Sequence, residues 1–217
     1  MPTKKRRNSI DIDNWRLAPY IMAMRKYPFD CGVEDLNSFF DSDIEKYDRE
    51  LIAKTFVLTP FGVRLSRSNP PLAFISFCND AIRRDVVMSE MGGTKSQWKK
   101  IVSLIPHNKQ YKALPAVKIA RLGVQQNVKS RGLGTQLLNM TKQLFLTDNR
   151  TGCRFLTVDS YITEQAIHFY EKNYFQFFTQ SEKERCFKKL KASPQTISGE
   201  PETVAMYYDL RRTMTAS

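Results

Sequence analysis

Residues 116–138 join a short apolar run, a turn with two glycines and the start of an amphipathic helix. The apolar run, from Val117 to Val124, is rich in β-branched residues and ends at a glycine turn, so it predicts a buried strand. Leucine and phenylalanine recur at helical spacing after Gly134. A helix is therefore expected to start at or just after that glycine.

This order of elements suits the binding of a phosphate group. The first N–H groups of a helix have no partner within the helix, and the aligned peptide dipoles add partial positive charge there. Gly132 and Gly134 allow positive φ and let a bulky anion approach the backbone closely. Lys129 and Arg131 add charge on the same rim. For two glycines alone, an ordinary tight connection between strand and helix is the alternative interpretation.

Two later segments complete a recognisable pattern. Residues 153–160 predict a second buried strand, and residues 164–175 predict a short helix that turns into another strand. The glycine turn reads Lys129-Ser130-Arg131-Gly132-Leu133-Gly134, and the later helix reads Ala166-Ile167-His168-Phe169-Tyr170-Glu171-Lys172-Asn173-Tyr174-Phe175. This order resembles the acetyl-CoA-binding half of the GNAT acyltransferases. Their pyrophosphate loop is usually Gln/Arg-x-x-Gly-x-Gly/Ala, and their later helix commonly carries Ala-x-x-Phe-Tyr-Glu-Lys-x-Gly-Phe.

Three positions depart from the family pattern. Lys129 replaces the usual Gln or Arg and keeps the charge, whereas Tyr174 replaces the usual Gly. Thr163 lies where many members have Asn. The last two changes bear on local turn geometry and on one cofactor contact.

The resemblance implies an α+β GNAT fold, with a central mixed, mostly antiparallel sheet flanked by helices and splayed at the acetyl-CoA-binding strand pair. It also implies that the backbone around Leu122 and Val124 pairs with the pantetheine arm of acetyl-CoA like an extra strand. The pyrophosphate would be held by Lys129, Ser130, Arg131, Gly132, Leu133, Gly134 and Thr135.

Tyr170 lies where the family keeps a tyrosine that protonates the departing thiolate, and a core aromatic is the alternative role. A phenol with a pKa of about 10 is protonated at neutral pH and can donate. His168 lies two residues away on the predicted helix and should face the opposite way, so we do not assign it as a base. The sequence indicates no clear general base.

The length of 217 residues and the 41% hydrophobic content predict one domain with decorations. We expect a flexible basic arm at 1–14 and a single domain at 15–217, with insertions at about 79–115 and 181–200. No apolar run spans a bilayer and no signal peptide is evident, so a cytoplasmic location is expected. Four scattered cysteines and two histidines favour free thiols and no metal site.

Further elements follow from local patterns. Apolar residues at helical spacing from Val33 predict an amphipathic helix with an acidic outer face. The remaining predicted elements are a first strand at 15–24, a hairpin of strands at 53–59 and 72–78, a short helix at 96–105, a mobile polar excursion at 181–200 and a last strand at 203–210.

The net charge of +12 is unevenly distributed. The first seven residues carry four of the positive charges, which leaves +8 elsewhere, while residues 30–50 are acidic. This balance suits a polyanionic partner. Residues 79–115 combine basic side chains with Trp98 and Tyr111. This composition suits a segment that contacts RNA, and it suits equally a lid whose aromatic side chains cover the core.

The segment Pro28–Leu58 adds a more specific likeness. Its Phe29-Asp30-Cys31-Gly32 turn, its Leu36 and Phe39-Phe40 positions and its Thr-Phe-Val strand resemble the GNAT toxins that acetylate aminoacyl-tRNA. This resemblance implies acetyl-CoA, tRNA and a small antitoxin as partners and leaves the oligomeric state open, with a dimer as one option. Candidate RNA contacts are Lys99, Lys100 and Arg121.

Two other functions remain open. Acetylation of a small cationic amine or peptide would suit the acidic stretch 30–50. A non-catalytic acyl-CoA-binding module is the alternative of another class, and the complete glycine loop together with Tyr170 argues against it.

Overall fold

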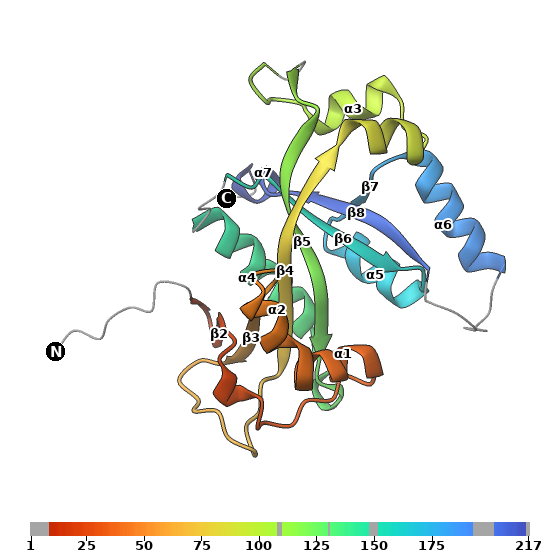
Figure 1. Cartoon of the computed structure of the whole chain (residues 1–217). Coiled ribbons are helices and arrows are strands. Elements are labelled where there is room, and N and C mark those ends of the chain that lie inside the picture. Colours follow the sequence, from red (N-terminus) through yellow and green to blue (C-terminus); the bar gives the residue numbers. More distant parts are fainter. Residues whose placement is uncertain (1–8, 108–109, 130, 148–151, 193–201, 216–217) are drawn as a thin grey trace. The chain divides into compact units, whose positions relative to one another are not determined.

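A computed structural model describes residues 9–107, 110–129, 131–147, 152–192 and 202–215. The chain divides into two compact units: unit 1 holds residues 1–79 and 119–151, and unit 2 holds residues 80–118 and 152–217. The hydrogen-bonded strand order is β1-β2-β3-β4-β5-β6-β8-β7. This mixed sheet with its flanking helices is the α+β GNAT fold that the sequence predicted (Figure 1). The splay between the acetyl-CoA-binding strands stays a prediction.

Unit 1 starts with an antiparallel meander of β1 (Ile10–Ile12), β2 (Trp15–Pro19), β3 (Lys54–Pro60) and the first part of β4 (Ala73–Arg83). The predicted hairpin of β3 and β4 is confirmed. The expectation of a flexible arm over 1–14 is wrong at its end, because β1 pairs with β2 and Arg16 holds Asp11 through two hydrogen bonds of 2.7 and 3.0 Å. Residues 1–8 lie outside the described residues.

The helix predicted from Val33 is confirmed as a continuous helical run. It consists of α1 (Glu34–Ser38), a π-helical turn (Phe39–Asp43) and α2 (Ile44–Arg49). Phe39, Phe40 and Ile44 face inward and pack with Phe29 and Phe74 in an aromatic core. The first strand is shorter than expected, since a 3₁₀ turn at Met22–Met24 replaces its end.

The organising stretch folds as its pattern predicted. Strand β5 (Ala113–Val124) is followed by a 3₁₀ turn (Gln126–Val128) and by α4 (Leu133–Thr147). The helix starts at Leu133, one residue before the predicted glycine. Leu137, Leu138 and Met140 on its inner face are fully buried, which is why the helix is amphipathic.

Unit 2 contains β6 (Phe155–Tyr161), α5 (Glu164–Lys172), β7 (Gln176–Phe177), α6 (Gln180–Ala192), β8 (Thr203–Asp209) and α7 (Arg211–Thr215). Strand β8 lies between β6 and β7 and is antiparallel to both (Figure 1). The second buried strand, the later helix and the last strand are therefore confirmed.

The segment that was expected to be a long connection is a folded part of unit 2. Strand β4 runs on to Arg83, a π-helical turn covers Val86–Glu90, and α3 covers Lys95–Ile101. Helix α3 is shorter than predicted and starts at a capping box, in which Thr94 and Gln97 satisfy each other's backbone N–H groups. Trp98 is only 5% exposed and packs in a cluster with Ile82, Leu114 and Phe155, so it covers the core.

The predicted mobile excursion at 181–200 is wrong over its first part. Residues 180–192 form helix α6, because Cys186 and Glu182 turn inward while lysines and arginine face outward. Residues 193–201 lie outside the described residues. All four cysteines are free thiols. Within the described ranges, none of the helices has the length and apolar character to cross a membrane, and metal-ligating side chains nowhere gather in threes.

Candidate functional site

The glycine loop of unit 1 has the conformation that an anion site needs. Gly132 adopts a φ of +77°, and a Cβ built there would meet no heavy atom within 4 Å. The amide of Gln136 donates to the Gly132 carbonyl at 3.0 Å, which is the first hydrogen bond of α4. The amides of Leu133 and Gly134 precede that bond and therefore face out of the helix end. The loop thus offers backbone donors beside open space.

The turn before this loop is fixed to residues 28–31 of the same unit. Gln125 is buried, donates through Nε2 to the Pro28 carbonyl at 3.0 Å, and accepts from the Asp30 amide at 3.1 Å. Gln126 Nε2 lies 3.2 Å from both carboxylate oxygens of Asp30, and Lys129 Nζ donates to the Cys31 carbonyl at 2.6 Å. The two segments that the sequence singled out separately are therefore in direct contact.

Asp30 is the centre of this contact. Its Oδ1 accepts from the Gly32 amide at 2.8 Å and from Asn37 Nδ2 at 2.9 Å, besides Gln126. These hydrogen bonds lower the pKa of the Asp30 carboxyl, with the Gly32 amide as the largest cause. Asn37 also accepts from the Cys31 amide at 2.8 Å. The Phe-Asp-Cys-Gly turn thus supports the loop.

The predicted pyrophosphate ligands are spread over this loop. Lys129 is occupied with Cys31, Arg131 is exposed, and Leu133 is buried. Gly134 and Thr135 lie in the first turn of α4 and are half-buried, while Ser130 lies outside the described residues.

The end of β5 carries the residues predicted to pair with the pantetheine arm. Leu122 and Val124 are half-buried at positions flanking Gly123. A Cβ on Gly123 would come within 2.7 Å of the Phe74 ring and 3.2 Å of the Phe29 ring, so only glycine fits there. Arg121, a predicted RNA contact, instead stacks 5.6 Å above the Phe39 ring, with its Nε 3.4 Å from Asp35.

Tyr170 lies in unit 2 on the inner face of α5. Its side chain is 8% exposed and contacts the rings of Phe169 and Phe175 at centroid distances of 5.0 and 5.2 Å. Burial raises the pKa of the Tyr170 phenol above its ordinary value, so the hydroxyl keeps its proton at neutral pH. His168 is exposed, consistent with the opposite orientation that helical spacing predicted.

The two other departures from the family pattern have a visible structural basis. The Thr163 hydroxyl accepts from the Ala166 amide at 3.2 Å and caps α5. Tyr174 adopts a φ of +68°, the left-handed conformation in which glycine is usual, and its side chain is 67% exposed.

Unit 2 also has a polar row that sequence reasoning missed. Asp80 accepts from the Thr157 hydroxyl, and Lys118 pairs with Asp159. Thr157 and Asp159 alternate with the buried Leu156 and Val158, so they share one face of β6. The alternation of residues along β6 could have predicted that Thr157 and Asp159 share a face. Their partners Asp80 and Lys118 come from β4 and β5, and no sequence spacing links these strands to β6.

The remaining RNA candidates, Lys99 and Lys100, are exposed on α3 in unit 2. The structure therefore divides the predicted site. The glycine loop, the β5 end and Arg121 belong to unit 1, whereas Tyr170, Lys99 and Lys100 belong to unit 2.

Comparison with known families matches residues 83–175 to the Acetyltransferase (GNAT) family. This segment is a GNAT acetyltransferase domain. Acyltransferases of this family use acetyl-CoA as the acyl donor, and the similar structure of AtaTR is bound with AcCoA. The match covers the glycine loop, Tyr170 and the folded segment around α3. No curated protein matches the sequence.

Solved structures resemble this acetyltransferase over almost its whole length. A tyrosine-to-phenylalanine mutant of KacT has a TM-score of 0.64 at 18% identity, covering 94% of this chain and 100% of that chain. AtaT complexed with acetyl-methionyl-tRNAfMet has a TM-score of 0.60 at 22% identity, covering 92% and 98%. A mutant AtaT toxin bound to the C-terminus of the antitoxin AtaR has a TM-score of 0.60 at 18% identity, covering 94% and 98%. At these identities the likeness describes the fold.

The glycine loop of this acetyltransferase is compatible with a pyrophosphate. The open space at Gly132, the outward amides of the first α4 turn and the exposed Arg131 guanidinium are complementary to a bulky anion. The Lys129 ammonium is held by the Cys31 carbonyl, and this bond fixes the loop to the rest of unit 1.

Proposed function

We propose that this acetyltransferase acetylates the amino group of aminoacyl-tRNA. The likeness to AtaT supports this proposal, because it covers 92% of the chain and so includes the region before residue 83, beyond the family match. That solved AtaT structure contains acetyl-methionyl-tRNAfMet. The surplus of positive charge outside the N-terminal arm suits an RNA acceptor.

The reaction needs little help from a base. The amine nitrogen attacks the thioester carbonyl carbon, the carbon–sulfur bond breaks, and the proton of the amine passes to solvent. An α-amine has a pKa of about 7.7–8.0 and is partly neutral at pH 7. Esterification to tRNA lowers that value further, so an aminoacyl ester is a substrate that an enzyme without a dedicated base is able to use.

Tyr170 is proposed to stabilise the leaving thiolate. A thiol has a pKa of about 8.5 and a phenol one of about 10, and burial raises the pKa of Tyr170 further. Complete proton transfer from the phenol to the thiolate is therefore uphill. A hydrogen bond from the phenol to the developing negative charge on sulfur, followed by protonation from water, costs less. The alternative is that Tyr170 only packs against Phe169 and Phe175.

A protein partner is part of the proposal. The likeness to AtaT bound to the C-terminus of the antitoxin AtaR supports a toxin that a small antitoxin holds inactive. Such a toxin would meet its tRNA substrate in the cytoplasm.

A small cationic amine or peptide is the second candidate acceptor. Glu34, Asp35 and Asp41 are exposed on the outer face of the α1–α2 run, and this acidic face would attract a polyamine. The same residues serve equally to keep the surface hydrated.

A side-by-side comparison of acceptors tests the proposal. Purified protein is incubated with labelled acetyl-CoA and, in parallel, with bulk aminoacyl-tRNA, uncharged tRNA, spermidine and a lysine peptide. We expect label on aminoacyl-tRNA that alkaline hydrolysis releases as an N-acetylamino acid. Label on spermidine or the peptide, with none on aminoacyl-tRNA, would replace the RNA acceptor by the second candidate.

A further inference from the structure

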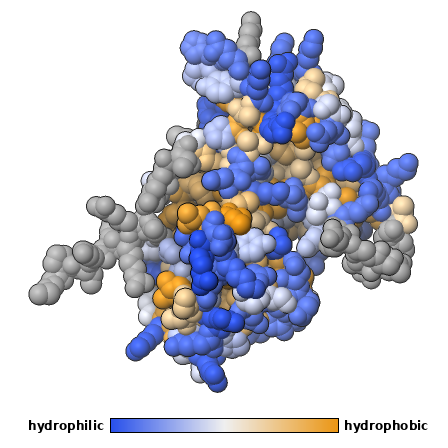
Figure 2. Space-filling model, in the orientation of Figure 1, coloured by the Kyte–Doolittle hydropathy of each residue, from blue (hydrophilic) through white to orange (hydrophobic). Residues whose placement is uncertain are grey.

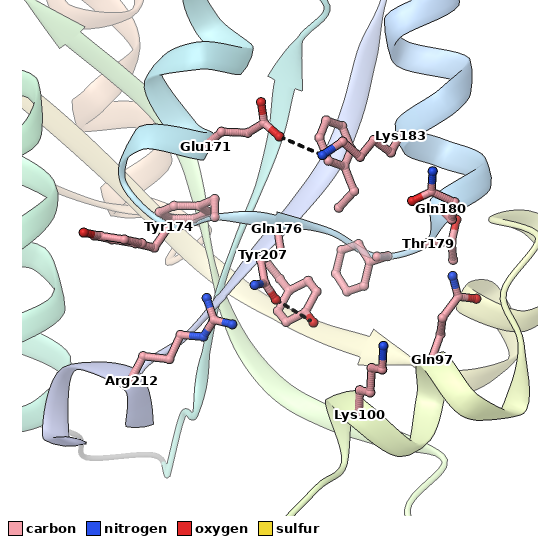
Figure 3. Close-up of a pocket in the computed structure, with 13 residues that line it drawn as sticks. Gln97, Lys100, Glu171, Tyr174, Gln176, Thr179, Gln180, Lys183, Tyr207 and Arg212 are labelled. Carbon is pink, nitrogen blue, oxygen red and sulfur yellow. Dashed lines mark hydrogen bonds and ion pairs between the residues drawn. The ribbon is translucent and has the colours of Figure 1, made fainter. Parts of the chain in front are cut away.

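Unit 2 contains a pocket lined by residues of β7 and β8, and two residues discussed above, Lys100 and Tyr174, also line it. Its volume is about 530 Å³, within the range of pockets that hold small organic molecules. The walls come from α3, the end of α5, β7, the start of α6, β8 and α7, all of them elements of unit 2 (Figure 3). The surfaces over α3 and α6 are largely hydrophilic (Figure 2).

Cations predominate in the lining. The lining includes three cationic side chains, Lys100, Lys183 and Arg212, and one carboxylate, Glu171. That carboxylate is already paired with Lys183 at 3.3 Å, and the Lys183 ammonium also lies 5.8 Å from the Phe177 ring. The lining therefore carries more positive than negative side chains.

The side chain of Gln176 contacts Arg212. The Gln176 amide, with its oxygen turned toward Arg212, accepts from Nη2 at 2.6 Å and from Nη1 at 2.9 Å. The same amide lies 3.4 Å from the Tyr207 hydroxyl (Figure 3). Burial raises the pKa of the Tyr207 phenol, so this hydroxyl keeps its proton. A preorganised guanidinium beside a hydroxyl is suited to a phosphate group.

Aromatic side chains supply the second half of the site. Phe177, Phe178 and Tyr207 are among the lining residues. Tyr174 lies on the Arg212 side of the pocket (Figure 3). Tyr174 is the residue with a φ of +68° where the family pattern has glycine. A left-handed conformation costs a non-glycine residue about 1–2 kcal/mol. An exposed ring kept at such a cost marks a position where a side chain has a use.

We propose that this pocket binds one nucleotide of the RNA acceptor, with the base stacked on Tyr174 and its two flanking phosphates held by Lys100 and by Arg212, respectively. The proposal rests on the proposed function and names a contact point for the RNA. Base stacking on an aromatic side chain is worth about 1–3 kcal/mol and needs no particular base. The site is therefore an anchor that positions the acceptor strand without reading its sequence.

Two neighbouring lysines on α3 make a matched test. Lys100 lines the pocket and Lys99 does not, although both are exposed and carry the same charge. Binding of a fluorescent single-stranded RNA octamer is measured by anisotropy over a range of salt. We expect Lys100→Gln to weaken binding and to reduce the salt slope by about 0.7, the value for one phosphate contact on a single strand. The pocket assignment removes Lys99 from the candidate RNA contacts, so Lys99→Gln should bind as the wild type does. Equal losses in both variants would overturn the assignment.

Tyr174 is tested by a pair of variants that separates stacking from folding. Tyr174→Gly restores the family residue and should fold, yet lose about 5- to 160-fold in RNA affinity, whereas Tyr174→Phe keeps the ring and should retain affinity. An unchanged affinity in Tyr174→Gly would overturn the stacking contact. An oligoglutamate octamer that binds as tightly, with the same dependence on Tyr174, would assign the pocket to an acidic protein segment instead.

The same variants distinguish the pocket from the proposed function. If the wild type acetylates aminoacyl-tRNA and Lys100→Gln and Tyr174→Gly have an unchanged KM for it, the pocket assignment fails and the function stands. If the octamer binds with the expected dependence on both residues but aminoacyl-tRNA is not acetylated, the function fails and the nucleotide site stands.

Discussion

Gly132 in unit 1 and Tyr174 in unit 2 adopt nearly the same backbone conformation, with φ of +77° and +68°. Each lies in one of the two motifs that resemble the family pattern. At Gly132 a Cβ would meet nothing, so the glycine leaves open space beside the amides of α4. Tyr174 carries a large ring at a backbone conformation that glycine adopts without strain, so the tyrosine costs conformational energy there. In the proposals made above, the open turn of unit 1 binds the acyl donor and the turn of unit 2 contacts the acceptor.

The largest expected effect is on kcat, and it tests whether unit 2 contributes to the chemical step while unit 1 binds the donor. Tyr170→Phe keeps the ring contacts of the core and removes the hydroxyl, so kcat should fall about 10²–10⁴-fold while acetyl-CoA affinity is unchanged. Tyr208→Phe is the matched control, because this buried tyrosine also loses a hydroxyl, which lies 2.8 Å from Thr213. Full turnover in Tyr170→Phe would leave Tyr170 a packing residue.

The next prediction tests whether the open turn at Gly132 binds acetyl-CoA. Gly132→Val places a β-branched side chain at positive φ, which should cost about 1–3 kcal/mol of stability, and fills the space where the pyrophosphate is proposed to lie. Acetyl-CoA affinity, measured by calorimetry, should fall at least about tenfold, which corresponds to 1.4 kcal/mol. Gly62→Val is the control, since Gly62 has a φ of +75° and equally open space outside the loop. Equal acetyl-CoA affinity in both variants would contradict a donor site at Gly132.

Sequence patterns predicted the elements of both turns but not their surroundings. The strand–turn–helix order and the α5 motif depend on local spacing, which is why β5, α4 and α5 were expected with ends within about four residues of those observed. The contact of Lys129 with the Cys31 carbonyl joins residues 98 positions apart and depends on a backbone atom, so no side-chain pattern records it. The fold of residues 79–112 was missed because its core partners, Phe155 and Phe178, come from the other end of the chain.

A smaller effect concerns the strained turn itself. Tyr174→Gly removes a left-handed penalty of about 1–2 kcal/mol but adds chain entropy to the unfolded state, which costs about 0.5–1 kcal/mol. We expect a net gain of roughly 0.5–1 kcal/mol in the free energy of unfolding, measured in urea. Tyr174→Ala also removes the ring but keeps a Cβ at positive φ, and should show no gain. A gain in both variants would mean that the ring, not the backbone, is unfavourable.

The smallest effect concerns Asp30, which supports the open turn from below. Hydrogen bonds from the Gly32 amide, Asn37 and Gln126 lower the pKa of its carboxyl in the folded state. A carboxyl with a lowered folded pKa stabilises the protein above its unfolded pKa of about 3.9, and this stabilisation is lost as the pH falls through the folded value. Asp30→Asn should therefore be less stable than the wild type at pH 6, with the difference shrinking below about pH 4. The difference in stability is measured as the difference between the urea midpoints of the two proteins from pH 6 to pH 3. Contributions from groups that titrate alike in both proteins cancel in that difference. A difference that stays constant across this range would mean that Asp30 acts through its shape and not through its charge.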